Sequence, residues 1–183
     1  MARSGWLILL LVLLQTMLPA GYAQAEDSFA KAVTDEGTLA YLSAALLLPL
    51  IRSDGEEQAQ SLRTADALAV SYIVSTVLKD ATDVERPDGS GDGSFPSRHA
   101  ALGFAAAAVA SEYEPDNAAG WYGGAALIGW SRVKLNRHRV GDVVAGAALG
   151  YGIAQLELGL PEGMLIAPFV DSDGGGLELR VSF

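Results

Sequence analysis

The chain has 183 residues, half of them hydrophobic, no cysteine, and a formal net charge of −10 at pH 7. The lack of cysteine excludes a core held by disulfides, and the acidic balance argues against binding nucleic acid or anionic lipid surfaces by bulk attraction. The length suits one domain whose stability rests on apolar packing.

Residues 1–25 have the pattern of a secretory signal peptide. Arg3 precedes an apolar run, and the small residues Ala23 and Ala25 form a cleavage motif just before Glu26. The alternative is a retained anchor, but the apolar run is short for a bilayer span, which needs about 20 apolar residues. We expect cleavage near Ala25 and export to the periplasm, or to the periplasmic face of a bacterial envelope.

Five apolar segments of about 11 to 14 residues follow, rich in Ala, Leu and Gly and bounded by Gly and Pro. They are longer than ordinary strands and predict helices. We therefore predict an all-α fold, a compact bundle of about five or six helices in one domain over residues 26–163. The segment lengths favour a soluble or peripheral bundle over an integral one. The segments are 39–51, 65–78, 100–110, 118–130 and 143–156.

Residues 164–183 have a different pattern. Met164 to Val170 and Leu177 to Phe183 flank a glycine-rich turn, and the second run alternates apolar with polar residues. Such alternation is typical of a strand with one buried face, so we expect a small C-terminal β-hairpin that covers one side of the bundle.

Positive charge is concentrated in one region of the chain. Cleavage at residue 25 would leave a net charge of −11, yet seven of the eleven remaining Lys and Arg residues lie between residues 79 and 139. The only two histidines, His99 and His138, lie in the same region. We interpret this clustering as a local anion site within an acidic protein. The seven cations are Lys79, Arg86, Arg98, Arg132, Lys134, Arg137 and Arg139.

Lys79 and Arg86 are two helical turns apart, so one face of a continued helix would carry both. Pro87 disfavours helix at the residue before it, which places Arg86 at a boundary. Taken alone, this segment is equally well explained as a solvated helix end with cations near its C-terminus.

Ser97 stands just before the apolar run 100–110, at a position where serine is a preferred N-cap. Capping alone explains Ser97. A helix N-terminus also attracts phosphate through its free N–H groups, and His99 in the first turn could then protonate a leaving oxygen.

His138 and Asp142 are four residues apart. On a helix they would share a face, and Asp142 could accept a hydrogen bond from one imidazole nitrogen and leave the other free as a nucleophile. Arg132 offers a planar fork of donors for oxyanion oxygens. The alternative is a surface His–Asp pair on a helix.

Together the motifs read Lys79-x6-Arg86-Pro87, Pro96-Ser97-Arg98-His99 and Ser131-Arg132-x5-His138-x3-Asp142. Their order and spacing resemble the PAP2 superfamily of type 2 phosphatidic acid phosphatases, class A bacterial acid phosphatases and vanadium haloperoxidases. The family pattern is K-x6-RP, PSGH and SR-x5-H-x3-D. The first and third motifs match in full, and the second matches in three of four positions.

The resemblance implies roles for eight residues. His138 would form a phosphohistidine intermediate, Asp142 would orient it, and His99 would act as general acid and then general base. No metal ion or other cofactor is expected, because cations would neutralise the phosphate, and vanadate is expected to inhibit. The implied phosphate-binding residues are Lys79, Arg86, Ser97, Arg98 and Arg132.

Arg98 departs from the family pattern, which has glycine there. Glycine lets a backbone amide approach the phosphate closely. Arginine keeps the N–H but adds a large charged side chain, which either points outward or contacts the phosphate or substrate. The eight residues between Pro87 and Pro96 leave little room for a large lid.

The resemblance implies a phosphatase for phosphomonoesters or (pyro)phosphate groups. In a bacterial envelope the resemblance implies lipid phosphates such as phosphatidic acid, phosphatidylglycerol phosphate, undecaprenyl diphosphate or lipid A, whereas the short helices and the signal peptide favour a soluble phosphomonoester. The alternatives are a soluble periplasmic non-specific acid phosphatase, a vanadium-dependent haloperoxidase and an inactive anion-binding module. Haloperoxidases of this type are usually much longer chains, and the retained histidines argue against an inactive module. The expected partner is a phosphorylated lipid or small phosphomonoester, not nucleic acid, with peripheral and integral membrane association both open.

Overall fold

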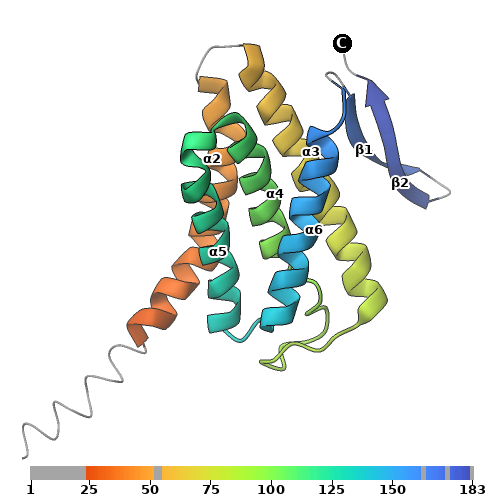
Figure 1. Ribbon diagram of the computed structural model, residues 1–183. Helices are drawn as coiled ribbons and strands as arrows, with labels where there is room; N and C mark the ends of the chain where they lie inside the picture. The colour runs from red at the N-terminus through yellow and green to blue at the C-terminus, as the bar shows by residue number, and fades with distance from the viewer. Residues whose placement is uncertain (1–23, 52–54, 162–163, 172–173, 182–183) are drawn as a thin grey trace, which may run out of the picture.

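The computed structural model describes residues 24–51, 55–161, 164–171 and 174–181 (Figure 1). The expected signal peptide lies outside the described residues except for its last two positions. Those two begin a helical segment, 24–32, which continues through a π-helical turn, η1 (Val33–Gly37), into α2 (Thr38–Ile51). The stretch before residue 38 was not predicted as helix, because it is polar and carries little periodic apolar signal.

The remaining helices confirm the predicted all-helical bundle. Each α-helix contains one of the predicted apolar segments; α3, α4 and α6 extend it at both ends, and α5 extends it only at its C-terminal end. The largest extension is in α3, whose N-terminal half presents many polar residues and so lacked the apolar run on which the prediction depended. The helices are α3 (Gly55–Thr82), α4 (Arg98–Tyr113), the 3₁₀ turn η2 (Pro115–Asn117), α5 (Ala118–Lys134) and α6 (Val140–Leu158).

Helix α4 forms the centre of the bundle, with α2, α3, α5 and α6 packed around it (Figure 1). Its alanines between Ala100 and Ala110 are almost entirely buried. Val70 of α3 and Ile153 of α6 pack with Val109 of α4 in the apolar core. A helix lined by methyl groups lets its neighbours approach closely, so the small residues of α4 set the spacing of the whole bundle.

The backbones of α4 and α6 approach each other closely at two glycines of α6. A Cβ built on Gly146 would meet the carbonyl oxygen of Ser97 at 2.3 Å, and one built on Gly150 would meet that of Ala101 at 1.9 Å. Only glycine fits at these two positions of α6. The contact matters for function because Ser97 and the first turn of α6 both belong to the sequence motifs.

Two antiparallel strands follow α6, β1 (Met164–Asp171) and β2 (Gly174–Val181), paired from Met164 opposite Val181 to Asp171 opposite Gly174. They lie beside α3 (Figure 1). Arg63 of α3 donates to the carbonyl oxygens of Glu157 and, at 3.1 Å, Leu160, and so caps the end of α6. Within the described part of the chain, no helix combines the length and the apolar character needed to cross a membrane.

Candidate active site

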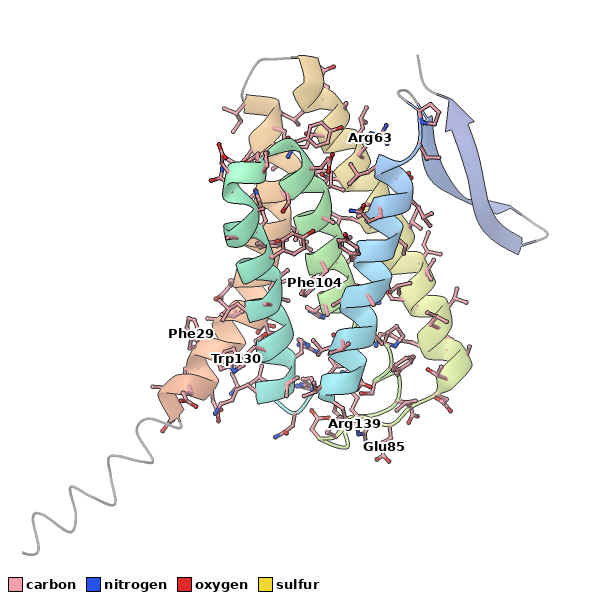
Figure 2. The ribbon with its side chains drawn as sticks, in the orientation of Figure 1. Phe29, Arg63, Glu85, Phe104, Trp130 and Arg139 are labelled. Atoms are coloured by element: carbon pink, nitrogen blue, oxygen red, sulfur yellow. The ribbon has the colours of Figure 1, made fainter. Side chains whose placement is uncertain are left out.

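The three sequence motifs meet at one end of the bundle, where the α3–α4 and α5–α6 connections lie together (Figure 1). Arg139 of the second connection donates from Nη1 to the carbonyl oxygen of Glu85 in the first at 3.0 Å. Figure 2 shows both residues at this end and Arg63 at the opposite end. Residues about 50 positions apart in sequence are therefore joined at one site.

The turn after α5 brings His138 beside Arg132. Asn136 has a positive φ of 53°, a conformation that asparagine tolerates better than most residues, and it reverses the chain. The amides of Arg137 and His138 then both donate to the carbonyl oxygen of Arg132, at 3.0 and 3.2 Å. His138 thus precedes α6 rather than lying on it. The expectation that His138 and Asp142 share a helix is wrong, although the turn still brings the two side chains near each other.

The His138 ring is buried and has a defined orientation. Its Nδ1 lies 2.7 Å from the carbonyl oxygen of Ser94, whereas the nearest oxygen of Asp142 lies 3.9 Å away. A carbonyl oxygen can only accept, so Nδ1 carries the proton and Nε2 carries the free lone pair. The predicted hydrogen bond from His138 to Asp142 is replaced by one to the Ser94 backbone, because 3.9 Å exceeds hydrogen-bond range.

Asp142 has other partners. Its Oδ2 accepts hydrogen bonds from the Ser94 hydroxyl at 2.6 Å and from the backbone N–H of Arg139 at 2.8 Å. The second of these satisfies a free donor at the start of α6. Its carbonyl oxygen accepts from the amide of Ser97 at 2.8 Å. Asp142 therefore joins the second and third motifs and the loop between α3 and α4.

Ser97 is the N-cap of α4, as predicted. It has an extended backbone conformation, is fully buried, and accepts from the amide of Ala100 at 3.5 Å. His99 lies in the first turn of the same helix and is partly buried. The free amides and positive end of α4 therefore point toward the motifs.

Three cations surround this end of the bundle. Lys79, in the last turn of α3, donates from Nζ to the carbonyl oxygen of Gly93, whose φ of 76° is a conformation that glycine adopts without strain. Arg86 lies beyond the end of α3, at the boundary that Pro87 predicted. The Nε atoms of Arg86 and Arg132 are buried and have no hydrogen-bond partner within the described residues. Two guanidinium groups that each have a buried, unused Nε donor suit an anionic ligand.

Electrostatics connect these groups into one site. The pKa of His138 is lowered to about 4 by burial and then by the charges of Lys79 and Arg132. The pKa of His99 is also lowered to about 4, by burial and then by Arg132, Arg98 and Lys79. Burial and the neighbouring arginines lower the pKa of Lys79 to about 8. Without an anion, the site therefore holds excess positive charge and two neutral histidines.

Arg98 lies at the edge of this site. Its guanidinium stacks 4.5 Å from the ring centre of Tyr72 and donates to Thr76 Oγ1 at 3.5 Å, both on α3. The side chain therefore lies along α3, while its charge still lowers the pKa of His99 and Lys79. The backbone N–H that the family glycine would offer remains at the start of α4.

Two contributions to the site were missed by the sequence analysis. Ser94 is one, a single serine in a loop rich in Gly and Ser that carries no distinguishing signal. The other is the N-terminal helix: Thr34 in η1 is buried and lies 2.6 Å, oxygen to oxygen, from the hydroxyl of Ser131 in the third motif. Asp35 beside it raises the pKa of both His99 and Arg132.

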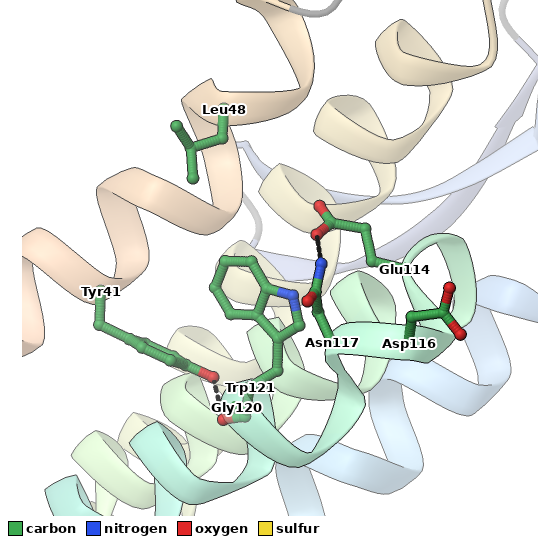
Figure 3. Close-up of a pocket in the computed structure, with 7 residues that line it drawn as sticks. All are labelled: Tyr41, Leu48, Glu114, Asp116, Asn117, Gly120 and Trp121. Carbon is green, nitrogen blue, oxygen red and sulfur yellow. Dashed lines mark hydrogen bonds between the residues drawn. The ribbon is translucent and has the colours of Figure 1, made fainter.

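A hollow of about 410 Å³ lies at the other end of the bundle, between α2, η2 and α5 (Figure 3). Tyr41 in its wall donates to the carbonyl oxygen of Trp121 at 2.7 Å, and Asn117 donates to Glu114 at 3.1 Å. None of the residues of the three motifs lines it. In the described part of the chain, no group of three or more His, Asp and Glu side chains is placed to hold a metal ion.

The helical fold and two histidines that share Lys79 and Arg132 as charged neighbours point to one class of protein, and comparison with known proteins agrees. The model of the PAP2 superfamily matches residues 62–162, more than half of the chain. The chain belongs to the PAP2 superfamily. The matched region contains all three motifs but not the N-terminal helix that contributes Thr34.

Individual relatives are similar over different extents. The lipid A 1-phosphatase of Porphyromonas gingivalis is 40% identical over 76 residues, which are 39% of this chain but only 17% of that protein. The crystal structure of Aquifex aeolicus LpxE superposes with a TM-score of 0.66 at 23% identity, covering 74% of this chain and 87% of that one. That likeness shows a shared fold. A transmembrane PAP2-type phosphatidylglycerolphosphate phosphatase from Bacillus subtilis matches with a TM-score of 0.45 at 23% identity, over 87% and 96% of the two chains.

Proposed function

We propose that this protein is a metal-independent phosphatase that hydrolyses phosphate esters or (pyro)phosphate groups through a phosphohistidine on His138. The observation that carries the proposal is the defined tautomer of His138, which leaves Nε2 unprotonated beside a cluster of cations. A neutral imidazole nitrogen is a competent nucleophile, and the cations supply the charge that a phosphoryl group requires.

In the first step the phosphate binds in the cationic cradle. The unused donors of Arg86 and Arg132 offer planar contacts to its oxygens. Lys79 and the free amides at the start of α4, capped by Ser97, add positive charge. Arg98 is proposed to donate its backbone N–H to the phosphate, while the positive charge of its side chain attracts the phosphate without contacting it.

Nε2 of His138 then attacks phosphorus, and the bond from phosphorus to the leaving oxygen breaks. His99 donates a proton to that oxygen, and the alcohol or phosphate leaves. A bound phosphate offsets the cations that depress the pKa of His99, so substrate binding itself favours the protonated form of this residue.

In the second step His99, now neutral, takes a proton from a water molecule. The resulting hydroxide attacks phosphorus, the phosphorus–nitrogen bond to His138 breaks, and inorganic phosphate is released. Asp142 supports both steps through the groups it holds, the Ser94 hydroxyl and the start of α6.

For the substrate we propose a phosphorylated lipid of the bacterial envelope, of the phosphatidic acid, phosphatidylglycerol phosphate, undecaprenyl diphosphate or lipid A type. The name of the Porphyromonas gingivalis relative supports this, since it acts on lipid A. The signal-peptide pattern of residues 1–25 supports a location at the periplasmic face of the envelope.

The test measures phosphate release from detergent-solubilised lipid phosphates and from a soluble phosphomonoester, with a metal chelator present. We expect turnover that vanadate inhibits and that His138→Ala abolishes, with the lipid preferred. Equal or better turnover of the soluble ester would replace the lipid substrate with a small one. Activity that requires vanadate, peroxide and halide would overturn the phosphatase in favour of a haloperoxidase.

A further inference from the structure

Ser94 makes hydrogen bonds to two residues of the third motif, through its carbonyl oxygen to the ring of His138 and through its hydroxyl to the carboxylate of Asp142. Ser94 itself lies outside all three sequence motifs. We propose that Ser94 is a positioning residue, which fixes the tautomer of His138 through its carbonyl oxygen and transmits the effect of Asp142 through its hydroxyl. The catalytic part of this inference rests on the proposed function. The tautomer can be measured without any activity.

The carbonyl oxygen of Ser94 is the group that orients the ring. It lies 2.7 Å from Nδ1 of His138, whereas Oδ2 of Asp142 lies 3.9 Å from the same atom. Both side chains are nearly inaccessible to solvent, so water does not compete freely for the ring nitrogen. The tautomer with a proton on Nδ1 is therefore favoured by the backbone of residue 94.

The hydroxyl of Ser94 holds that carbonyl in place. It lies 2.6 Å from Oδ2 of Asp142, and a hydrogen bond to an ionised carboxylate is roughly twice as strong as a neutral one. The same carboxylate oxygen is fixed by the N–H of Arg139 at 2.8 Å, which ties it to the start of α6. Asp142 thus acts on the peptide of Ser94 rather than on the ring directly.

The amide of Ser94 provides the third point of attachment. It donates to the carbonyl oxygen of Val84 at 2.7 Å, across the loop that carries Arg86. Ser94 itself is fully buried. The amide, carbonyl and hydroxyl of Ser94 therefore each bind a different segment. The residue links the start of the α3–α4 loop, the His138 ring and the first turn of α6.

This arrangement predicts a specific consequence for Ser94→Ala, which removes the hydroxyl but keeps the carbonyl. The peptide loses its anchor to Asp142, so the hydrogen bond to Nδ1 should weaken and the other tautomer should become populated. Because the cradle is unchanged, kcat should fall about 10- to 100-fold, as expected for loss of one charge-assisted hydrogen bond, while KM stays within about twofold. Ser90→Ala is the matched control, an exposed serine of the same loop.

The experiment combines ¹⁵N NMR of the His138 ring with kinetics of Ser94→Ala, Asp142→Ala and the double variant. We expect a proton on Nδ1 in the unchanged protein, a shift toward protonated Nε2 in both single variants, and a double variant no slower than the slower single one. Vanadate binding by each variant shows that its phosphate-binding residues, Lys79, Arg86 and Arg132, are still correctly arranged.

Two results would overturn the inference. One is a protonated Nε2 in the unchanged protein, and the other is losses of kcat in the single variants that multiply in the double variant. If the protein has no phosphatase activity, the proposed function fails, and the ring tautomers alone then decide the role of Ser94.

Discussion

The amide of Ser97, at the start of α4, donates to the carbonyl oxygen of Asp142 in the first turn of α6 at 2.8 Å. This single bond places two helix N-termini side by side, so the positive ends of both helices meet at one site. It depends on the glycines of α6 that allow the two backbones to approach.

Gly146→Ala should therefore damage both the fold and the site. Its Cβ would meet the Ser97 carbonyl oxygen at 2.3 Å, and backbone atoms cannot give way as a flexible side chain can. We expect a loss of about 1–3 kcal/mol in the free energy of unfolding, as for overpacking elsewhere, and a loss of turnover. Urea unfolding measures the first. Gly152→Ala is the control on the same helix, where a Cβ meets nothing within 4 Å; a similar loss there would contradict the account.

Arg98→Gly should restore the family residue at little cost to turnover. The Arg98 guanidinium is held by Tyr72 and Thr76, so its removal should change kcat/KM by less than about tenfold, against the loss of about 10²–10³ typical for a group that stabilises transition-state charge. Arg132→Ala is the comparison, since its buried Nε has no partner within the described residues. A loss in Arg98→Gly as large as in Arg132→Ala would make the Arg98 side chain a phosphate ligand.

Asp35→Asn should lower the pKa of His99 further. Asp35 raises that pKa, against the lowering by burial, Arg132, Arg98 and Lys79. His99 must be protonated to act as the general acid, so removing the charge of Asp35 should shift the alkaline limb of the kcat/KM profile to lower pH. Glu36→Gln is the matched control, with the same change of charge one residue along the same turn. Equal shifts in both variants would show that the His99 pKa responds to the total charge of this turn and not to Asp35 in particular.

Stability should fall on acidification as the two histidines are protonated. Their folded pKa values of about 4 lie below the ordinary 6.5, so the unfolded chain binds more protons between these values. The free energy of unfolding should therefore decrease as pH falls from 6.5 toward 4. In the His99→Gln and His138→Gln variants this slope should be shallower in urea titrations at several pH values. A slope unchanged by both substitutions would show that other groups cause the acid sensitivity.

Binding of an oxyanion should partly reverse the lowering of the His99 pKa. Vanadate or phosphate in the cradle opposes the positive charges that lower the pKa of His99, so NMR titration should show a higher pKa when either anion is bound. An unchanged or lowered pKa would place the anion elsewhere.

The helices could be predicted because each buries an apolar segment, and the motif residues could be predicted because their spacing is local. The partner of His138 could not. Its hydrogen bond goes to a backbone carbonyl 44 positions away, and backbone groups leave no mark in a sequence. The left-handed backbone of Asn136 also places His138 in the turn before α6. The four-residue spacing of His138 and Asp142 does not reveal this turn.

The N-terminal helix was missed for a related reason. Residues 26–37 are mostly polar, and their place in the fold depends on a few tertiary contacts. Lys134 of α5 pairs with Glu26 at 2.6 Å, Phe29 packs on Trp130 (Figure 2), and Thr34 contacts Ser131. Such contacts depend on the position of α5, which no local pattern gives.

The central claim is that the phosphoryl group passes through His138, and rapid quenching of a reaction with a ³²P-labelled substrate tests it most directly. We predict an acid-labile, base-stable label that peptide mapping assigns to His138, that is absent in His138→Ala, and that accumulates when His99→Ala slows its hydrolysis. Turnover without a covalent label, or a label on any other residue, would contradict the account.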